Sequence, residues 1–156
     1  MRHENGFEDT FRLAFRYEAA HRFTQSCADS CATPHGHTWQ AQAIFASPSL
    51  MLGLDDMVME FSQLKRAWKT FITETVDHSF LHHHKDPLLP ALREHIPGFR
   101  GLPFPGDPTT ELIAALFFAK LTTMHGALRT SSHHPHHHHR HHHPGSWPEP
   151  VSVVIR

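Results

Sequence analysis

The chain has 156 residues, enough for one domain but not comfortably for two. Apolar residues make up 39% of it, so a core can be buried, and a formal net charge of -1 argues against binding to nucleic acid or to an acidic membrane surface. No stretch approaches the ~20 apolar residues of a membrane span, and the polar start of the chain lacks the apolar region of a secretory signal. We expect residues 1–10 to be a flexible N-terminus and residues 11–156 to form a single domain.

Two strands are predicted in the first third of the chain. Residues 11–17 alternate between apolar and polar side chains, which is typical of a half-buried strand. Residues 26–34 are small and polar and predict a loop. Residues 35–45 predict a second strand, with Trp39 and Phe45 on one of its faces.

Two helices are predicted next. Residues 61–76 place apolar side chains at spacings of three and four, and Ser62 could cap the start of this helix. Residues 81–106 are rich in proline and glycine and predict a long connection. Asp107 is then expected to be an N-cap, with Pro108 at the first position of a second helix that reaches about residue 124.

The last part of the chain is unusual in its histidine content. Residues 131–144 contain nine histidines, cannot bury a core and predict a mobile loop. We expect this loop, like the consecutive histidines at 82–84, to bind divalent metals loosely and to be dispensable. Residues 151–155 resemble a strand, so the predicted order is strand, strand, helix, helix, strand.

Three histidines suggest a metal site. His35 and His37 point to the same face of the second strand, about 6.6 Å apart along it, and Gly36 lets the backbone bend between them. His21 ends the first strand and would lie beside them if the two strands pair antiparallel. Three imidazoles with an open fourth position describe a catalytic zinc site, whereas a fourth ligand from Cys31 would make a structural one. Spacing alone leaves open whether these histidines bind metal or are ordinary hydrogen-bonded residues.

Two further motifs suggest proton transfer. A thiolate forms readily beside a dication, so a loop cysteine could act as a base, although spacing does not rank Cys27 against Cys31. The closeness of these two cysteines argues against a useful disulfide and favours a cytoplasmic protein with reduced thiols. Asp77 precedes His78, and a carboxylate can orient an imidazole for proton relay. The relay requires the helix to end there; the alternative is a merely polar helix terminus.

These residues give the chain a resemblance to the 6-pyruvoyl-tetrahydropterin synthase family, including its bacterial branch, the 6-carboxytetrahydropterin synthases. Residues 59–65 resemble the family's Asp-Phe-x-x-Leu-Lys segment, with Glu60 in place of the aspartate. Four other segments match in order: residues 15–23 (FRYEAAHRF), 31–37 (CATPHGH), 76–81 (VDHSFL) and 107–111 (DPTTE).

The resemblance implies a role for each residue. The implied zinc ligands are His21, His35 and His37. Cys31, rather than Cys27, is the implied catalytic proton acceptor. The implied relay on the opposite side of the substrate is Asp77 with His78, and the implied pterin contacts are Thr109 and Thr110.

The resemblance also implies an α+β tunnelling fold, a ββααββ unit whose antiparallel sheet carries two helices on one face. Such subunits usually form homohexamers with active sites between subunits. Because the family continues into a Glu-Thr segment that anchors the pterin, and then into a final strand, we expect that last strand to be missing from a chain that stops at Arg156.

The implied activity is that of a zinc-dependent lyase, 6-carboxy-5,6,7,8-tetrahydropterin synthase. It converts 7,8-dihydroneopterin triphosphate to 6-carboxytetrahydropterin, acetaldehyde and triphosphate, for 7-deazaguanine and queuosine synthesis. The partner would be this small molecule, with neither nucleic acid nor membrane. The alternatives are a 6-pyruvoyl-tetrahydropterin synthase and an inactive, truncated zinc-binding homologue.

Overall fold

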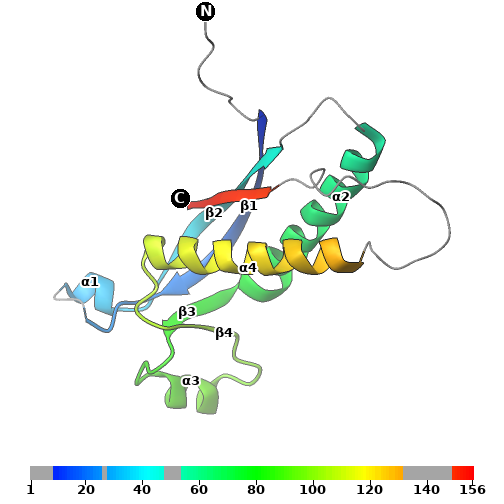
Figure 1. The fold of residues 1–156 in the computed structure, drawn as a ribbon. Helices are drawn as coiled ribbons and strands as arrows, with labels where there is room; N and C mark the ends of the chain where they lie inside the picture. Colours follow the sequence, from blue (N-terminus) through cyan, green and yellow to red (C-terminus); the bar gives the residue numbers. More distant parts are fainter. Residues whose placement is uncertain (1–8, 26–27, 48–53, 132–148) are drawn as a thin grey trace, which may run out of the picture.

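The computed structural model describes residues 9–25, 28–47, 54–131 and 149–156 (Figure 1). The expected flexible N-terminus and the histidine-rich loop therefore lie almost entirely outside the described residues, as does Cys27. In chain order the elements are β1 (Asp9–His21), α1 (Asp29–Ala32), β2 (His35–Ser47), α2 (Leu54–Phe71), the π-helical turn η1 (Ile72–Val76), β3 (Ser79–His83), α3 (Leu89–His95), β4 (Gly101–Phe104), α4 (Thr110–Ser131) and β5 (Glu149–Ile155).

The five strands form one mixed sheet in the order β4-β3-β1-β2-β5. β1 and β2 pair antiparallel along their full lengths, which places Tyr17 opposite Trp39 and His21 opposite His35. β5 continues the sheet antiparallel to β2, whereas β3 and β4 are added in parallel on the other side of β1. The long β1–β2 ribbon is therefore the centre of the sheet.

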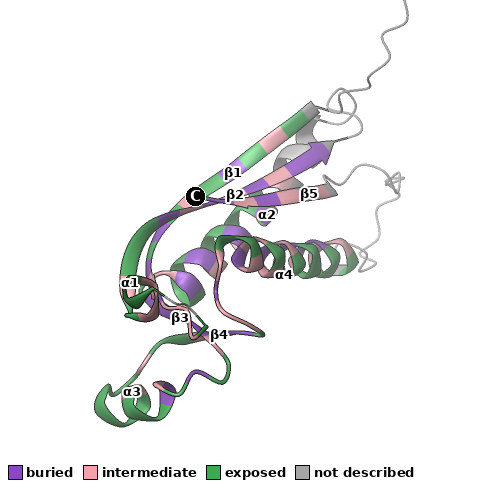
Figure 2. Cartoon of the chain, turned by 90° about the vertical axis from the view of Figure 1, so that its left-hand side faces the viewer, coloured by how far each residue is buried: buried purple, intermediate pink, exposed green. Residues whose placement is uncertain are grey.

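The core lies between one face of this sheet and the helices α2 and α4 (Figures 1 and 2). Burial alternates along β1 and β2 because successive side chains of a strand point to opposite faces. Trp68 of α2 and Phe117 of α4 are buried against this face. The strand residues of the core are Leu13, Tyr17, Ala19, Trp39, Ala41, Ala43, Phe45, Leu81, Phe104, Val153 and Ile155.

The predicted strand pair, the two helices on one face, the C-terminal strand and the α+β class are confirmed. The connection predicted over residues 81–106 is wrong in part, because it contains the end of β3, all of α3 and all of β4. α3 and β4 each contain a proline, which interrupts the hydrophobic pattern by which a helix or strand is recognised. Pro103 fits within β4 because that strand lies at the sheet edge. The sheet is consequently mixed rather than antiparallel.

Two smaller predictions are also wrong. α2 begins at Leu54, so Ser62 lies inside the helix and does not cap its start. The consecutive histidines at 82–84 do not all lie in the predicted connection, because His82 and His83 end β3. His82 is buried, and its ring stacks on that of Phe80 with the centroids 5.9 Å apart.

α4 is more apolar than the sequence analysis allowed. By length and composition alone, residues 110–130 would suffice to cross a membrane. Ile113, Phe117 and Leu121 of this helix are buried in the core against the sheet, whereas only 22% of the apolar window is buried. One face of α4 is thus part of the core.

Candidate active site

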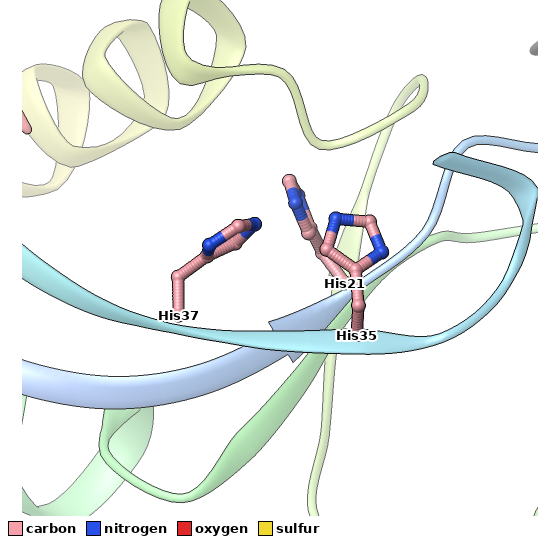
Figure 3. Close-up of side chains that lie close together, drawn as sticks. All are labelled: His21, His35 and His37. Atoms are coloured by element: carbon pink, nitrogen blue, oxygen red, sulfur yellow. The ribbon is translucent and has the colours of Figure 1, made fainter. Parts of the chain in front are cut away.

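Three histidine side chains lie together where β1 ends and β2 begins, on the face of the sheet that also carries the core residues (Figure 3). His21 is the last residue of β1 and lies opposite His35, the first residue of β2, with His37 two residues further along. One ring nitrogen of each lies within 4.8 Å of the others. The ring centroids of His21 and His37 lie 5.0 and 5.2 Å from that of Trp39, the first core residue of β2. The cluster therefore stands where the core gives way to solvent, with His21 buried and His37 exposed.

Backbone carbonyls orient two of the three rings. His21 Nδ1 lies 2.9 Å from Pro108 O, and His35 Nδ1 lies 2.7 Å from Thr33 O. A carbonyl oxygen can only accept, so Nδ1–H is the donor in both contacts. Each neutral ring then keeps the lone pair of Nε2 for a ligand.

The environment of His21 favours the neutral ring. Burial lowers its pKa, the bond to Pro108 O works in the opposite direction, and the neighbouring His35 and His37 lower the pKa further. The net pKa lies below the ordinary value of histidine. A neutral imidazole is the form that coordinates a metal ion.

The cluster fits a zinc ion. Three nitrogen atoms bound to one zinc ion at roughly 2.0–2.1 Å would lie about 3.3 Å apart in tetrahedral geometry. Because the ring nitrogens already lie within 4.8 Å of one another, modest ring rotations bring them onto one ion. Three imidazole donors are one fewer than the four protein ligands of a closed structural site, and this number fits a catalytic zinc site. This is the one such cluster found among the described residues.

The segment before α4 contacts the cluster through the carbonyl oxygen of Pro108, which lies beside His21. Asp107 is not the N-cap that the sequence predicted: it lies before the cap, which is Thr109, whose Oγ1 accepts a hydrogen bond from Leu112 N at 3.2 Å. The carboxylate of Asp107 instead accepts hydrogen bonds from Thr24 and Gln25. Pro108 O contacts His21, and Thr109 and Thr110 follow Pro108 directly at the start of α4. The two threonines are therefore neighbours in the chain of a residue that contacts the histidine cluster.

The predicted catalytic cysteine lies in α1, between β1 and β2. Cys31 is a half-buried free thiol, and its carbonyl accepts a hydrogen bond from Phe23 N at 2.8 Å. Arg22, the residue after His21, donates to Ala32 O at 3.0 Å. Both contacts tie the cysteine segment to the end of β1.

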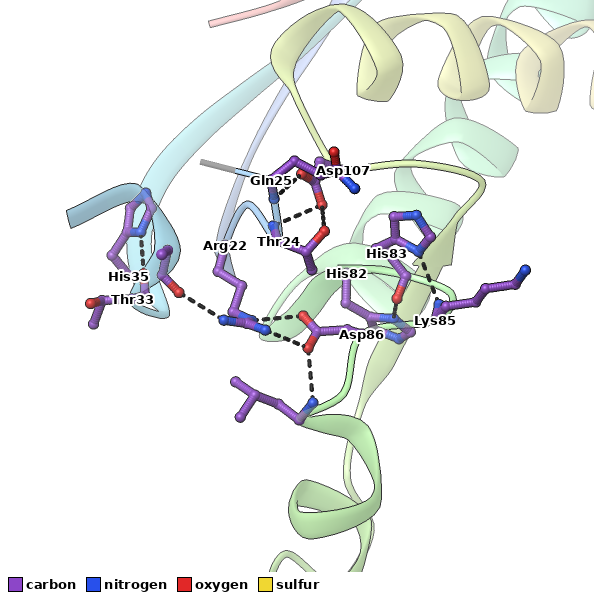
Figure 4. A network of polar contacts seen from close by, with 12 residues as sticks. Arg22, Thr24, Gln25, Thr33, His35, His82, His83, Lys85, Asp86 and Asp107 are labelled. Atoms are coloured by element: carbon purple, nitrogen blue, oxygen red, sulfur yellow. Dashed lines mark hydrogen bonds and ion pairs between the residues drawn. The ribbon is translucent and has the colours of Figure 1, made fainter. Parts of the chain in front are cut away.

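The other side of the Arg22 guanidinium forms an ion pair that the sequence analysis missed. Arg22 Nε and Nη2 each lie 2.8 Å from an oxygen of Asp86, a fork-to-fork geometry (Figure 4). Burial alone raises the pKa of Asp86, but bonds from Arg22 and from the Leu88 N–H outweigh it and lower the pKa overall. The cysteine segment is thereby fixed to the turn between β3 and α3.

The predicted contact between Asp77 and His78 is formed at the end of the helix. η1 ends at Val76, Asp77 is extended, and His78 adopts the left-handed conformation with φ 59°. Asp77 Oδ2 lies 3.0 Å from His78 Nδ1, and Oδ1 accepts a hydrogen bond from Glu18 N at 2.9 Å. The hydrogen bond from the Glu18 N–H is the main reason that the pKa of Asp77 lies below its ordinary value, and the contact with His78 lowers the pKa further. The condition set by the sequence analysis, that the helix end there, is met.

The relay pair and the histidine cluster lie on opposite faces of the sheet. His78 lines a hollow of about 400 Å³ together with Glu18, Ala20, Gly36 and Thr38, and Ala19, His37 and Ser79 also border it. Glu18, Ala20 and Thr38 alternate along the strands with the residues of the histidine cluster and the core, so their side chains point to the other face of the sheet. One chain therefore presents its imidazole cluster and His78 in opposite directions.

Two sequence comparisons relate the chain to known proteins. Residues 10–143 match the sequence model of the 6-pyruvoyl tetrahydropterin synthase family. A 6-carboxy-5,6,7,8-tetrahydropterin synthase from Aquifex aeolicus is 32% identical over 121 residues, which cover 67% of this chain and 73% of that protein.

Two solved structures share the fold. An uncharacterized protein from Wolinella succinogenes has a TM-score of 0.63 at 22% identity, covering 94% of this chain and 92% of its own. The 6-pyruvoyl tetrahydropterin synthase of Plasmodium falciparum has a TM-score of 0.53 at 14% identity, covering 80% of this chain and 85% of its own. From the family match over most of its length and the relative at 32% identity, the chain belongs to the 6-pyruvoyl tetrahydropterin synthase family.

Proposed function

We propose that this chain is a zinc-dependent 6-carboxy-5,6,7,8-tetrahydropterin synthase. Its substrate would be 7,8-dihydroneopterin triphosphate, and its products 6-carboxytetrahydropterin, acetaldehyde and triphosphate. The observation that carries the proposal is the three-imidazole cluster at the joined ends of β1 and β2. The carboxy product is favoured by the 32% identity with the Aquifex aeolicus enzyme of that name.

His21, His35 and His37 would hold the zinc ion, which when bound supplies Lewis-acid polarisation of substrate oxygen atoms. The chain's own residues supply the rest of the chemistry. Thr109 and Thr110 would contact the pterin ring at the start of α4, next to the carbonyl that orients His21. Cys31 would accept a carbon-bound proton from the substrate as its thiolate.

His78 would exchange protons on the other side of the substrate. Because His78 Nδ1–H donates to the Asp77 carboxylate, Nε2 is left to accept or deliver a proton. Asp77 is itself anchored by the Glu18 N–H, so the direction of the His78 ring follows from the strand.

We further propose that the active sites lie between subunits of a homohexamer. The support is the arrangement of the site residues: the imidazole cluster and His78 leave opposite faces of one sheet. A substrate held at the cluster of one chain would therefore meet the relay pair of a second copy. The enzyme is proposed to act in the cytoplasm on this small molecule alone, with its product used for 7-deazaguanine and queuosine synthesis.

A second candidate is 6-pyruvoyl-tetrahydropterin synthase activity, which the name of the matching family favours. It would use the same site to eliminate triphosphate without cleaving the side chain. Incubating the purified chain with 7,8-dihydroneopterin triphosphate, followed by mass spectrometry, separates the two. Acetaldehyde and 6-carboxytetrahydropterin are expected; 6-pyruvoyl-tetrahydropterin alone would favour the second candidate, and unchanged substrate would refute both.

A further inference from the structure

A single carboxylate joins the start of α4 to the segment that follows β1 (Figure 4). Asp107 Oδ1 accepts hydrogen bonds from the N–H and the hydroxyl of Thr24, at 2.9 and 2.8 Å, and Oδ2 accepts one from Gln25 N at 3.1 Å. Burial alone raises the pKa of Asp107, but these donors outweigh it and lower the pKa overall. Both oxygens of an ionised carboxylate are thus used to hold a segment more than 80 residues away in the chain.

The next residue contacts the metal cluster directly. Pro108 O lies 2.9 Å from His21 Nδ1. Pro108 is buried, and its ring fixes φ and removes the N–H, so the direction of its carbonyl depends closely on where Asp107 is held. Thr24 follows His21 by three residues. Pro108 therefore contacts His21 at the end of β1, and Asp107 contacts Thr24 and Gln25 just after it.

We propose that Asp107 is a positioning residue for the metal centre, which keeps Pro108 O on His21 Nδ1–H and so presents His21 Nε2 to the ion. This inference rests on the zinc site of the proposed function. A hydrogen bond to the far ring nitrogen fixes the tautomer and orientation of a metal-bound histidine. A role for Asp107 as helix cap does not explain its bonds, because Thr109 already caps α4.

The test is the zinc affinity of the full-length chain in which the histidines between 133 and 143 are replaced by glutamine, so that they do not compete for metal. Affinity is measured by competition with a chromophoric chelator. Asp107→Ala is expected to weaken zinc binding about 10–100-fold. Asp107→Asn keeps an acceptor for Thr24 but places a donor opposite the Gln25 N–H, so it should weaken binding by a smaller factor and decides the matter if Asp107→Ala does not fold.

Ile113→Val is the matched control. It removes one buried methyl group from the first turn of α4 and leaves the Asp107 bonds in place, so its zinc affinity should equal that of the parent. If both Asp107 variants also bind zinc like the parent, the positioning role is overturned. A loss of affinity in Ile113→Val as large as in Asp107→Asn would likewise overturn it, because general destabilisation would then explain the effect.

A second readout separates positioning from general structural support. In the metal-free parent, side-chain nitrogen NMR shifts should show His21 protonated at Nδ1, whereas Asp107→Ala should show a mixture of tautomers. His21→Ala identifies the signal and tests the zinc site itself. Tight zinc retained in His21→Ala would refute the proposed metal site, whereas zinc lost there but unaffected by both Asp107 variants would refute the positioning role alone.

Discussion

Removal of Asp86 should destabilise the protein far more than removal of an average polar side chain. The side chain of Asp86 is fully buried, and that of its partner Arg22 is only 14% exposed. Removing one partner of such a pair leaves an uncompensated charge, which typically costs ~3–5 kcal/mol. In Asp86→Leu the Leu88 N–H also loses its acceptor, so we expect a free energy of unfolding lower by about 3–4 kcal/mol. Against a total stability of about 5–15 kcal/mol, this is a large fraction.

The assay is urea denaturation of Asp86→Leu and of the double variant Arg22→Met/Asp86→Leu. With a slope of ~2 kcal/mol per molar urea, a loss of ~3 kcal/mol lowers the midpoint by about 1.5 M. The double variant should recover at least half of that loss, because an apolar pair replaces a buried ion pair at little cost. A midpoint lowered by less than about 0.3 M in Asp86→Leu, or no recovery in the double variant, would refute the view that this pair is desolvated and coupled.

Three further predictions concern the site and its electrostatics. Cys31→Ala should retain zinc and lose roughly 10²–10⁴-fold in turnover, whereas Cys27→Ala should remain active. An equal loss of turnover in the two variants would contradict the assignment of Cys31 as the proton acceptor. Inactive His21→Ala and His78→Ala chains, unfolded and refolded together in equal amounts, should recover about a quarter of the parent activity if each site combines two subunits, and no recovery would argue against shared sites. Acid should destabilise the fold: carboxylates whose pKa is lowered in the folded state stabilise it above their unfolded pKa of about 3.9, and that contribution is lost as pH falls through the lower, folded pKa values. Thermal unfolding between pH 6 and pH 2 measures this, and unchanged stability below pH 4 would be the contrary result. The carboxylates concerned are Asp77, Asp86 and Asp107.

The closeness of the three histidines could be predicted from the sequence because its geometry follows from local rules. Residues two apart on a strand share a face, which relates His35 to His37, and a short loop between two strands implies the antiparallel pairing that brings His21 opposite His35. The contact between Asp77 and His78 was predictable for a similar reason: one turn at the end of a helix decides whether Asp77 reaches His78.

The supports of the site could not be predicted, because they join residues that are far apart in the chain. Asp107 followed by proline is typical of a helix start, and nothing local shows that its carboxylate instead binds a segment 83 residues earlier. The Arg22–Asp86 pair spans 64 residues. β4 is four residues long and includes a proline, so the hydrophobic pattern that reveals a longer strand has too few positions to be recognised.

The zinc dependence of pterin turnover tests the central claim most directly. The protein is stripped of metal with a chelator, reloaded with measured amounts of zinc, and incubated with 7,8-dihydroneopterin triphosphate while triphosphate and pterin products are quantified. The account predicts that stripped protein is inactive, that activity returns in proportion to zinc up to one ion retained per chain at His21, His35 and His37, and that His37→Ala cannot be restored. Stripped protein as active as reloaded protein, or full restoration of His37→Ala, would contradict the claim that these three histidines form the catalytic metal centre.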